Sequence, residues 1–265
     1  MSTPLFHVDA FTDRPFAGNP AGVCLLSEDR EDAWMQNIAR EMNLSETAFL
    51  RRREGHWDLR WFTPAVEVDL CGHATLASAH VLWEAGHAKS GEPLVFQTRS
   101  GRLAAAQRNG GIELDFPAEP ATPASEPPDL RPALGISGGR FAGRNRFDYL
   151  IEAEDEASVR ALGPDFRRLA AAGGPARGVI VTAMSSQPGR DFVSRYFAPA
   201  VGIDEDPVTG SAHCCLGPFW AERLGKKELT GYQASARGGT VHVRVEGPRV
   251  FLGGTAVTIS RGELA

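Results

Sequence analysis

The 265-residue sequence predicts an α+β protein made of two copies of one unit, on the basis of three observations. Residues 60–69 read RWFTPAVEVD and residues 195–204 read RYFAPAVGID, identical at six of ten positions with a constant offset of 135. An apolar helix is expected soon after each segment, and a proline-rich segment lies between the two halves. A shared pattern of this length indicates an internal repeat, with the copies related by a pseudo-two-fold axis.

In the first half, strands are followed by an amphipathic helix and then by a buried helix. Trp34, Ile38 and Met42 recur at helical spacing, which predicts one apolar helix face. Residues 74–85 are apolar nearly all round and are followed by Gly86, as expected for a buried helix. The remaining elements expected here are strands at 4–11, 21–26, 47–50 and 59–62, a helix at 29–42, and a hairpin that turns at 109–111.

The middle of the chain reads as a connector, because six prolines fall between residues 117 and 132. Proline disfavours both helix interiors and central strands. On either side of this segment, residues 101–114 and 239–252 both read as strand, turn and strand. The second pair of matching segments extends the repeat beyond the first.

Composition and charge exclude two classes of function. The net charge of −5 and the pI of about 5.8 argue against nucleic-acid binding, and the one basic run is Arg51-Arg52-Arg53. No apolar segment approaches the roughly 20 residues of a membrane span, and the N-terminus lacks the apolar core of a secretory signal. The sequence therefore predicts a cytoplasmic protein, in which the four cysteines are reduced.

Each copy carries a turn of small residues directly before its buried helix. Cys71-Gly72-His73-Ala74 aligns with Thr209-Gly210-Ser211-Ala212, after three extra residues in the second copy. A helix N-terminus exposes unpaired N–H groups and partial positive charge, which suit an anion. Two such helix starts facing each other would hold a small carboxylate substrate. The alternative is that both glycines only permit close packing of strand and helix.

Four segments together resemble one family. They read VDAFTDRPFAGNPAGV (8–23), NLSETAFL (43–50), RWFTPAVEVDLCGHAT (60–75) and EDPVTGSAH (205–213). The chain resembles, over essentially its whole length, the PhzF-like isomerases of phenazine biosynthesis, which share the diaminopimelate-epimerase fold. The resemblance implies two similar domains, each a curved mixed β-sheet wrapped around a central helix. The first covers residues 1–118, with 255–265 returning to it, and the second covers 119–254.

The same resemblance implies a site between the domains, catalysis without metal or organic cofactor, and commonly a homodimer. It also implies roles for eight residues. They are Glu46 as the proton-shuttling carboxylate, His73 and Asp206 as polar groups that flank the substrate, Gly72, Gly210 and Ser211 as substrate anchors, and Asn19 and Asp9 as supporting or positioning groups.

Each catalytic candidate also has an ordinary structural interpretation. Glu46 could be a surface carboxylate at a strand entry, and Asp206, which precedes a proline, could be a cap or turn residue. His73 could be a first-turn helical residue that is hydrogen-bonded to a neighbour. Chemistry favours Glu46, because moving a proton between two carbons of a substrate requires one base that can then act as an acid.

The cysteines raise three further possibilities. Epimerases of this fold use two thiols, but the position that matches Cys71 in the second copy is Thr209, which is too weak an acid to replace a thiolate. Cys71 is therefore interpreted as a small buried residue near the site. A hydrolase using Cys71 and His73 is rejected because positions i and i+2 do not share a helix face. Residues 213–215 read His-Cys-Cys, but such adjacent side chains point in different directions, so a core helix is favoured over a metal site.

The sequence thus predicts a cofactor-independent isomerase of a small carboxylate metabolite, with proton transfer by Glu46. Two alternatives stay open at this point. One is a catalytically silent small-molecule-binding protein, and the other is an amino-acid epimerase that uses Glu46 and Cys71 as opposed bases.

Overall fold

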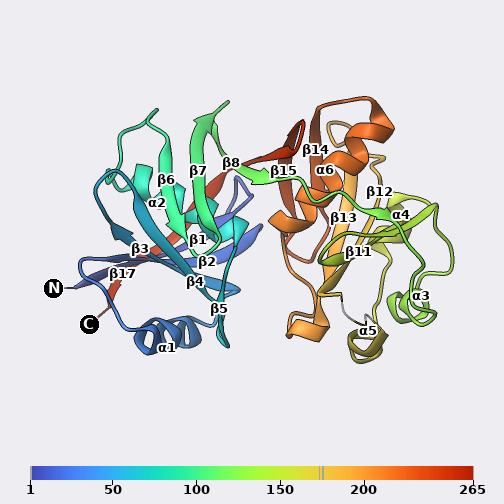
Figure 1. Cartoon of the computed structure of the whole chain (residues 1–265), viewed down its shortest axis with the longest axis horizontal. Helices are drawn as coiled ribbons and strands as arrows, with labels where there is room; N and C mark the ends of the chain where they lie inside the picture. Colours follow the sequence, from blue (N-terminus) through green and yellow to red (C-terminus); the bar gives the residue numbers. More distant parts are fainter. Residues whose placement is uncertain (1, 173, 175, 265) are drawn as a thin grey trace. The chain divides into compact units, whose positions relative to one another are not determined.

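The structure is a computed structural model that describes residues 2–172, 174 and 176–264. By their internal contacts, the residues divide into two compact units. Unit 1 comprises Met1–Phe116 and Phe251–Ala265, and unit 2 comprises Pro117–Val250. Figure 1 traces both units in sequence colours. No helix in the described part of the chain is long and apolar enough to cross a membrane.

Unit 1 is a mixed sheet with two helices. Its strands are β1 (Thr3–Ala10), β2 (Asn19–Leu26), β3 (Glu46–Arg52), β4 (Trp57–Phe62), β5 (Glu67–Val68), β6 (Leu94–Thr98), β7 (Gly101–Arg108), β8 (Gly111–Pro117) and β17 (Ala256–Leu264), and its helices are α1 (Asp32–Met42) and α2 (Gly72–Glu84). β1 pairs antiparallel with β17 and β2, and β2 pairs parallel with β3. Then β3–β4 is antiparallel, β4–β6 is parallel, and β6–β7–β8 is antiparallel.

Unit 2 repeats this order of pairings. Its elements are β9 (Thr122–Pro123), α3 (Leu130–Leu134), β10 (Phe141–Arg144), β11 (Asp148–Glu152), α4 (Glu156–Arg160), α5 (Phe166–Ala172), β12 (Gly178–Met184), β13 (Phe192–Phe197), the 3₁₀ turn η1 (Pro199–Val201), α6 (Gly210–Leu224), β14 (Glu228–Gln233), β15 (Gly239–Glu246) and β16 (Arg249–Gly254), whose last residues belong to unit 1. β10–β11 is antiparallel, β11–β12 parallel, β12–β13 antiparallel, β13–β14 parallel and β14–β15 antiparallel. Both units therefore have the same mixed-sheet plan.

Each sheet packs against one long buried helix, as the apolar composition of these helices predicts. α2 contacts β1, β2, β3 and β17, and α6 contacts β14 and β15. Leu76, Val81 and Leu82 of α2 are fully buried, as are Cys215 and Leu216 of α6. Burying a leucine or valine side chain stabilises a fold by about 1.5–3 kcal/mol, so these helices are anchored by their own side chains.

Two predicted elements differ from the structure. The helix expected at 29–42 begins at Asp32, because the capping residue Glu31 has an extended backbone at φ −66° and ψ 148°. Asp29 lies outside the helix and accepts a hydrogen bond from Nη2 of Arg53 at 2.6 Å. The proline-rich segment is part of unit 2 and contains β9 and the start of α3. Pro132 lies in the first turn of α3, where a helix needs no N–H donor, so the expectation that this segment resists helix was wrong there.

The loop before each buried helix is closed by an arginine–glutamate pair. In unit 1, Nε and Nη2 of Arg60 donate to both carboxylate oxygens of Glu67 at 2.7 and 2.8 Å. In unit 2, Nε and Nη2 of Arg195 donate to both oxygens of Glu205 at 2.7 and 2.9 Å. Two parallel bonds of this kind fix the orientation of both side chains, so each pair fixes the path of its loop.

Candidate active site

The start of α2 is fixed by its own capping residue. Cys71 precedes the helix with an extended backbone, at φ −145° and ψ 110°. Its carbonyl oxygen accepts hydrogen bonds from Oγ1 of Thr75 at 2.6 Å and from the Thr75 N–H at 3.2 Å. Gly72 and His73 then form the first turn, as predicted for a helix start. The side chains of Cys71 and His73 are both buried there.

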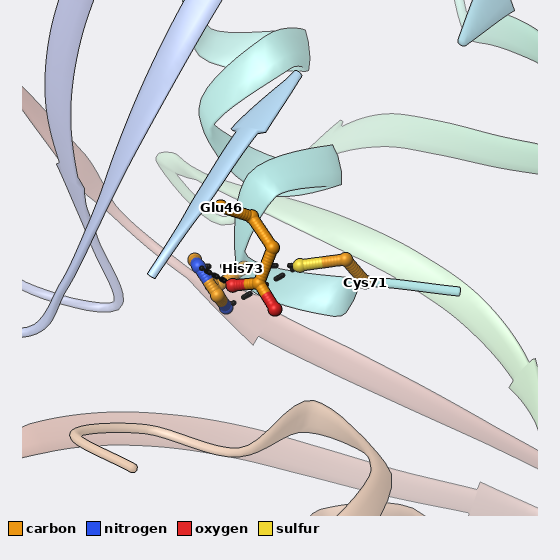
Figure 2. Close-up of side chains that lie close together, drawn as sticks. All are labelled: Glu46, Cys71 and His73. Carbon is orange, nitrogen blue, oxygen red and sulfur yellow. Dashed lines mark hydrogen bonds and ion pairs between the residues drawn. The ribbon is translucent and has the colours of Figure 1, made fainter. Parts of the chain in front are cut away.

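Glu46, His73 and Cys71 form one cluster at this point (Figure 2). Glu46 is the first residue of β3, and its Oε2 lies 3.1 Å from Nε2 of His73. The sulfur of Cys71 lies 3.5 Å from Nδ1 of the same ring. The side chains of His73 and Glu46 are 6% and 13% exposed. The structure thus brings two of the predicted catalytic residues together in a nearly dry environment.

The electrostatics of the cluster favour a charged imidazole. Burial lowers the pKa of His73, but the Cys71 sulfur and the Glu46 carboxylate raise it, and the net pKa lies well above its ordinary value. Burial and the negative charge of Glu46 raise the pKa of Cys71 to about 11. The thiol therefore keeps its proton near neutral pH. The cluster holds an imidazolium between a carboxylate and a thiol, which is an arrangement that can store and move a proton.

The expectation that Cys71 and His73 point in different directions was wrong. It holds for two helical residues at positions i and i+2. Because Cys71 is the capping residue with an extended backbone, its side chain turns back toward the first helical turn. Cys71 is buried, as predicted, but it contacts a candidate catalytic residue.

In unit 2, Asp206 lies in the loop before the matching helix. Gln233, which no sequence motif indicated, contacts this loop. Thr209 caps α6, and its Oγ1 donates to Oδ2 of Asp206 at 2.5 Å. The side chain of Gln233 is fully buried at the end of β14. Its Oε1 accepts from the Thr209 N–H at 2.9 Å, and its Nε2 donates to the Asp206 carbonyl at 2.7 Å. Gln233 therefore fixes the loop that carries Asp206.

Ser211 in the first turn of α6 is bonded to an arginine that the sequence analysis also missed. Nη2 of Arg177 donates to Oγ of Ser211 at 2.9 Å and to Oδ2 of Asp148 at 2.8 Å. The hydroxyl of Tyr196 donates to Oδ1 of Asp148 at 2.9 Å. The contact with Arg177 therefore fixes the position of the Ser211 hydroxyl. Gly210 is buried beside it as the first residue of the helix.

The N-terminal motif forms a tight turn rather than a cluster of exposed polar groups. Oδ2 of Asp9 accepts from the Phe16 N–H at 2.8 Å. Gly18 has φ +65°, and a Cβ there would come within 2.1 Å of the Ala10 carbonyl oxygen. Asn19 follows at the start of β2, with its side chain fully buried. Asp9 therefore supports the turn that places Asn19.

The interpretation of residues 213–215 as part of a core helix is confirmed. His213, Cys214 and Cys215 are buried in α6. Nδ1 of His213 lies 2.8 Å from the carbonyl oxygen of Thr209, and burial lowers the pKa of this ring to about 4. His213 is therefore a neutral structural residue that bonds to the helix cap.

Comparisons with known proteins agree with this fold. An uncharacterized isomerase of Halalkalibacterium halodurans is 54% identical to the chain, over 100% of this chain and 99% of that protein. A crystal structure of a PhzF-family phenazine biosynthesis protein from Enterococcus faecalis has a TM-score of 0.92 at 44% identity, with 100% of both chains covered. A probable proline racemase from Agrobacterium radiobacter shares the fold, with a TM-score of 0.65 at 11% identity over 99% of this chain and 93% of the other.

The protein is thus an isomerase with the α+β fold that is also found in racemases and epimerases. More specifically, it belongs to the PhzC-PhzF family of phenazine biosynthesis-like proteins, and the match to this family runs over residues 8–262. Both the resemblance and the fold class predicted from the sequence are confirmed.

Proposed function

We propose that this isomerase moves a carbon-bound proton on a small carboxylate metabolite, with Glu46 as the acid–base group and no cofactor. The observation that carries the proposal is the 3.1 Å contact between Oε2 of Glu46 and Nε2 of His73 in a nearly buried setting. A carboxylate alone is a poor base for a C–H bond in water. The contact with the His73 ring fixes the orientation of the carboxylate in a site that excludes most of the water.

The proposed step needs only one carboxylate. Oε2 of Glu46 is engaged by the His73 ring, so the substrate proton is assigned to Oε1. The electron pair of the broken C–H bond passes into the adjacent unsaturated system of the substrate. The protonated Glu46 then returns the proton to a different carbon, and the enzyme ends in its starting state. His73 stabilises the negative charge of the carboxylate before and after the transfer.

The helix start of each unit, taken by itself, offers groups that bind a carboxylate. Gly72 in unit 1 and Gly210 and Ser211 in unit 2 offer N–H groups at helix N-termini, where a carboxylate is favoured. The Ser211 hydroxyl adds a polar group whose position is fixed by Arg177. Asp206 is assigned to a substrate amino or hydroxyl group, and Asn19 to positioning.

An epimerase is the second candidate, and one contact supports it. The Cys71 sulfur lies 3.5 Å from the His73 ring, so a proton relay from thiol to imidazole to Glu46 is geometrically available. The raised pKa of Cys71, about 11, opposes a thiolate base at neutral pH. We therefore favour an isomerase that uses Glu46 alone over an epimerase that also uses the Cys71 thiolate.

Hydrogen exchange in deuterated water separates the two. A panel of small unsaturated and amino carboxylates is incubated with the wild type and with the Glu46→Gln and Cys71→Ala variants, and carbon-bound deuterium is followed by NMR. We expect Glu46→Gln to slow exchange by about 10²-fold or more, and Cys71→Ala to leave it within a few-fold. Exchange that survives Glu46→Gln would contradict the proposal. Exchange abolished by both changes would favour the epimerase.

A further inference from the structure

An arginine that has no role in the proposed reaction lies beside the first turn of α6. We infer that Arg177 binds the substrate carboxylate there, next to Ser211, and that the buried carboxylate of Asp148 orients its guanidinium group. This inference rests on the proposed function and adds a substrate-binding residue to it. All three residues lie in unit 2.

The register of the unit 2 sheet brings the acid and the arginine together. Asp148 is the first residue of β11, and it pairs with Gly178, the first residue of β12, directly after Arg177. Tyr196 of β13 donates its hydroxyl hydrogen to the same carboxylate at 2.9 Å. A Cβ at position 178 would come within 2.5 Å of that hydroxyl oxygen, so the contact requires glycine there. The sheet itself therefore fixes where the arginine begins.

Asp148 occupies one edge of the guanidinium group. Nε of Arg177 donates to Oδ1 at 3.2 Å, and Nη2 donates to Oδ2 at 2.8 Å. Two parallel bonds of this kind fix the plane and the direction of the group. The carboxylate is completely buried, whereas the arginine side chain is 38% exposed. A buried ion pair adds little net stability over apolar residues of similar size, so stability alone does not explain this one.

The outer end of the guanidinium group faces Ser211. A guanidinium has five N–H donors in one plane, and Nη1 and Nη2 present two parallel ones at the outer end. Nη2 donates its outer hydrogen to Oγ of Ser211 at 2.9 Å. Nη1 thus presents a parallel N–H beside this hydroxyl, and it makes no hydrogen bond to any residue that the structure describes. A carboxylate lying against Ser211 can accept from Nη1.

The charge of Arg177 makes a carboxylate the expected ligand. Burial lowers the pKa of Arg177, but its hydrogen bond with Asp148 raises it, and the net pKa lies above its ordinary value. Its Cζ lies 5.0 Å from the ring centre of Phe147 and 5.9 Å from that of Tyr196, so two aromatic rings adjoin the cation. Hydrogen bonds between a guanidinium and a carboxylate are about twice as strong as those between neutral groups. The geometry therefore favours an acid over an amide or an alcohol.

The preference for an acid over its carboxamide tests this inference. A panel compound that exchanges deuterium with the wild type is compared with its carboxamide, which keeps the shape and lacks the charge. Exchange is followed by NMR at several concentrations, which gives KM and kcat for the acid. The carboxamide is added as a competing inhibitor, which gives its inhibition constant. Loss of an interaction made equally in the ground state and the transition state raises KM and leaves kcat unchanged.

Two substitutions decide the result. Arg177→Met combined with Asp148→Asn removes the cation without leaving a buried charge unpaired, so circular dichroism should show a folded protein. It should raise KM for the acid by more than about tenfold and change the inhibition constant of the carboxamide by less than about threefold. Arg177→Lys keeps the charge but not the parallel donors, and it should raise KM by at least about threefold. Arg146→Met is the matched control, because Arg146 also stacks on Phe147 and pairs with the Glu119 carboxylate, and it should change neither constant.

The outcomes separate this inference from the proposed function. An unchanged preference for the acid in the folded double variant, or in Arg177→Lys where the double variant does not fold, would overturn the inference alone. Parallel losses of affinity for the acid and for the carboxamide would also overturn it, because they would show a structural role for Arg177. Absence of exchange by the wild type with every compound would contradict the proposed function and the inference together.

Discussion

Replacing Gln233 with leucine should loosen the loop that carries Asp206. The side chain of Gln233 is fully buried, and it accepts from the Thr209 N–H and donates to the Asp206 carbonyl. Leucine is similar in size but satisfies neither group. Leaving a buried polar group unpaired costs about 1–3 kcal/mol, so two such groups predict a loss of about 2–6 kcal/mol in the free energy of unfolding.

Urea-induced unfolding, followed by far-ultraviolet circular dichroism, measures this loss. Gln233→Glu is the informative control, because a carboxylate keeps the acceptor for Thr209 N–H and removes the donor to Asp206. At neutral pH its buried carboxylate faces the Asp206 carbonyl oxygen, so it should lose at least as much as Gln233→Leu, and it should lose less at a pH low enough to protonate the carboxyl group and restore a donor. A Gln233→Leu variant within about 0.5 kcal/mol of the wild type would refute the reasoning, because it would mean that these buried groups find other partners at no cost.

Three further changes test other contacts of unit 2. Burial raises the pKa of Glu156, but hydrogen bonds led by that from the Ser186 N–H lower it to about 2. This carboxylate should therefore contribute about 3 kcal/mol of stability, fully present above pH 4.5 and lost as the pH falls through 2. Over that range, the difference in the free energy of unfolding between the wild type and Glu156→Gln should shrink. Burial lowers the pKa of His213 to about 4. The free energy of unfolding of the wild type in urea should therefore fall by about 3 kcal/mol between pH 6.5 and 4, because the unfolded chain binds the proton first. A free energy of unfolding that stays constant over this range would show that His213 is solvated. Arg177→Met removes the ion-pair partner of the buried Asp148 carboxylate and should lower the free energy of unfolding by about 3–5 kcal/mol. Adding Asp148→Asn should recover most of the loss in a double-mutant cycle.

The fold could be predicted from the sequence because the sequence contains two copies of one pattern. The repeated RxFxPAVxxD pattern and the two apolar helices define the plan of both units, and the family motifs identify the fold class, which the structural comparison confirms. Element ends were less accessible, because they depend on tertiary partners. Asp29 precedes α1 and bonds to Arg53 instead, and this contact spans 24 residues.

The site was only partly accessible from the sequence. Motif resemblance selected Glu46 and His73, which the structure places 3.1 Å apart. Gln233 and Arg177 lie outside every quoted motif, and their partners are 24 to 34 residues away in sequence, so no local pattern marks them. Cys71 was misjudged because its contact depends on one extended backbone residue before a helix, which residue spacing does not show.

The arginine–glutamate pairs have a consequence for how the two halves could diverge. In unit 1 the glutamate follows its arginine by seven positions, at Arg60 and Glu67, whereas in unit 2 it follows by ten, at Arg195 and Glu205. The longer loop of unit 2 is closed by a glutamate that lies further along the chain. Each unit therefore closes its loop with residues of its own. Loss of Glu67 is therefore expected to loosen the loop of unit 1 alone, and loss of Glu205 the loop of unit 2 alone.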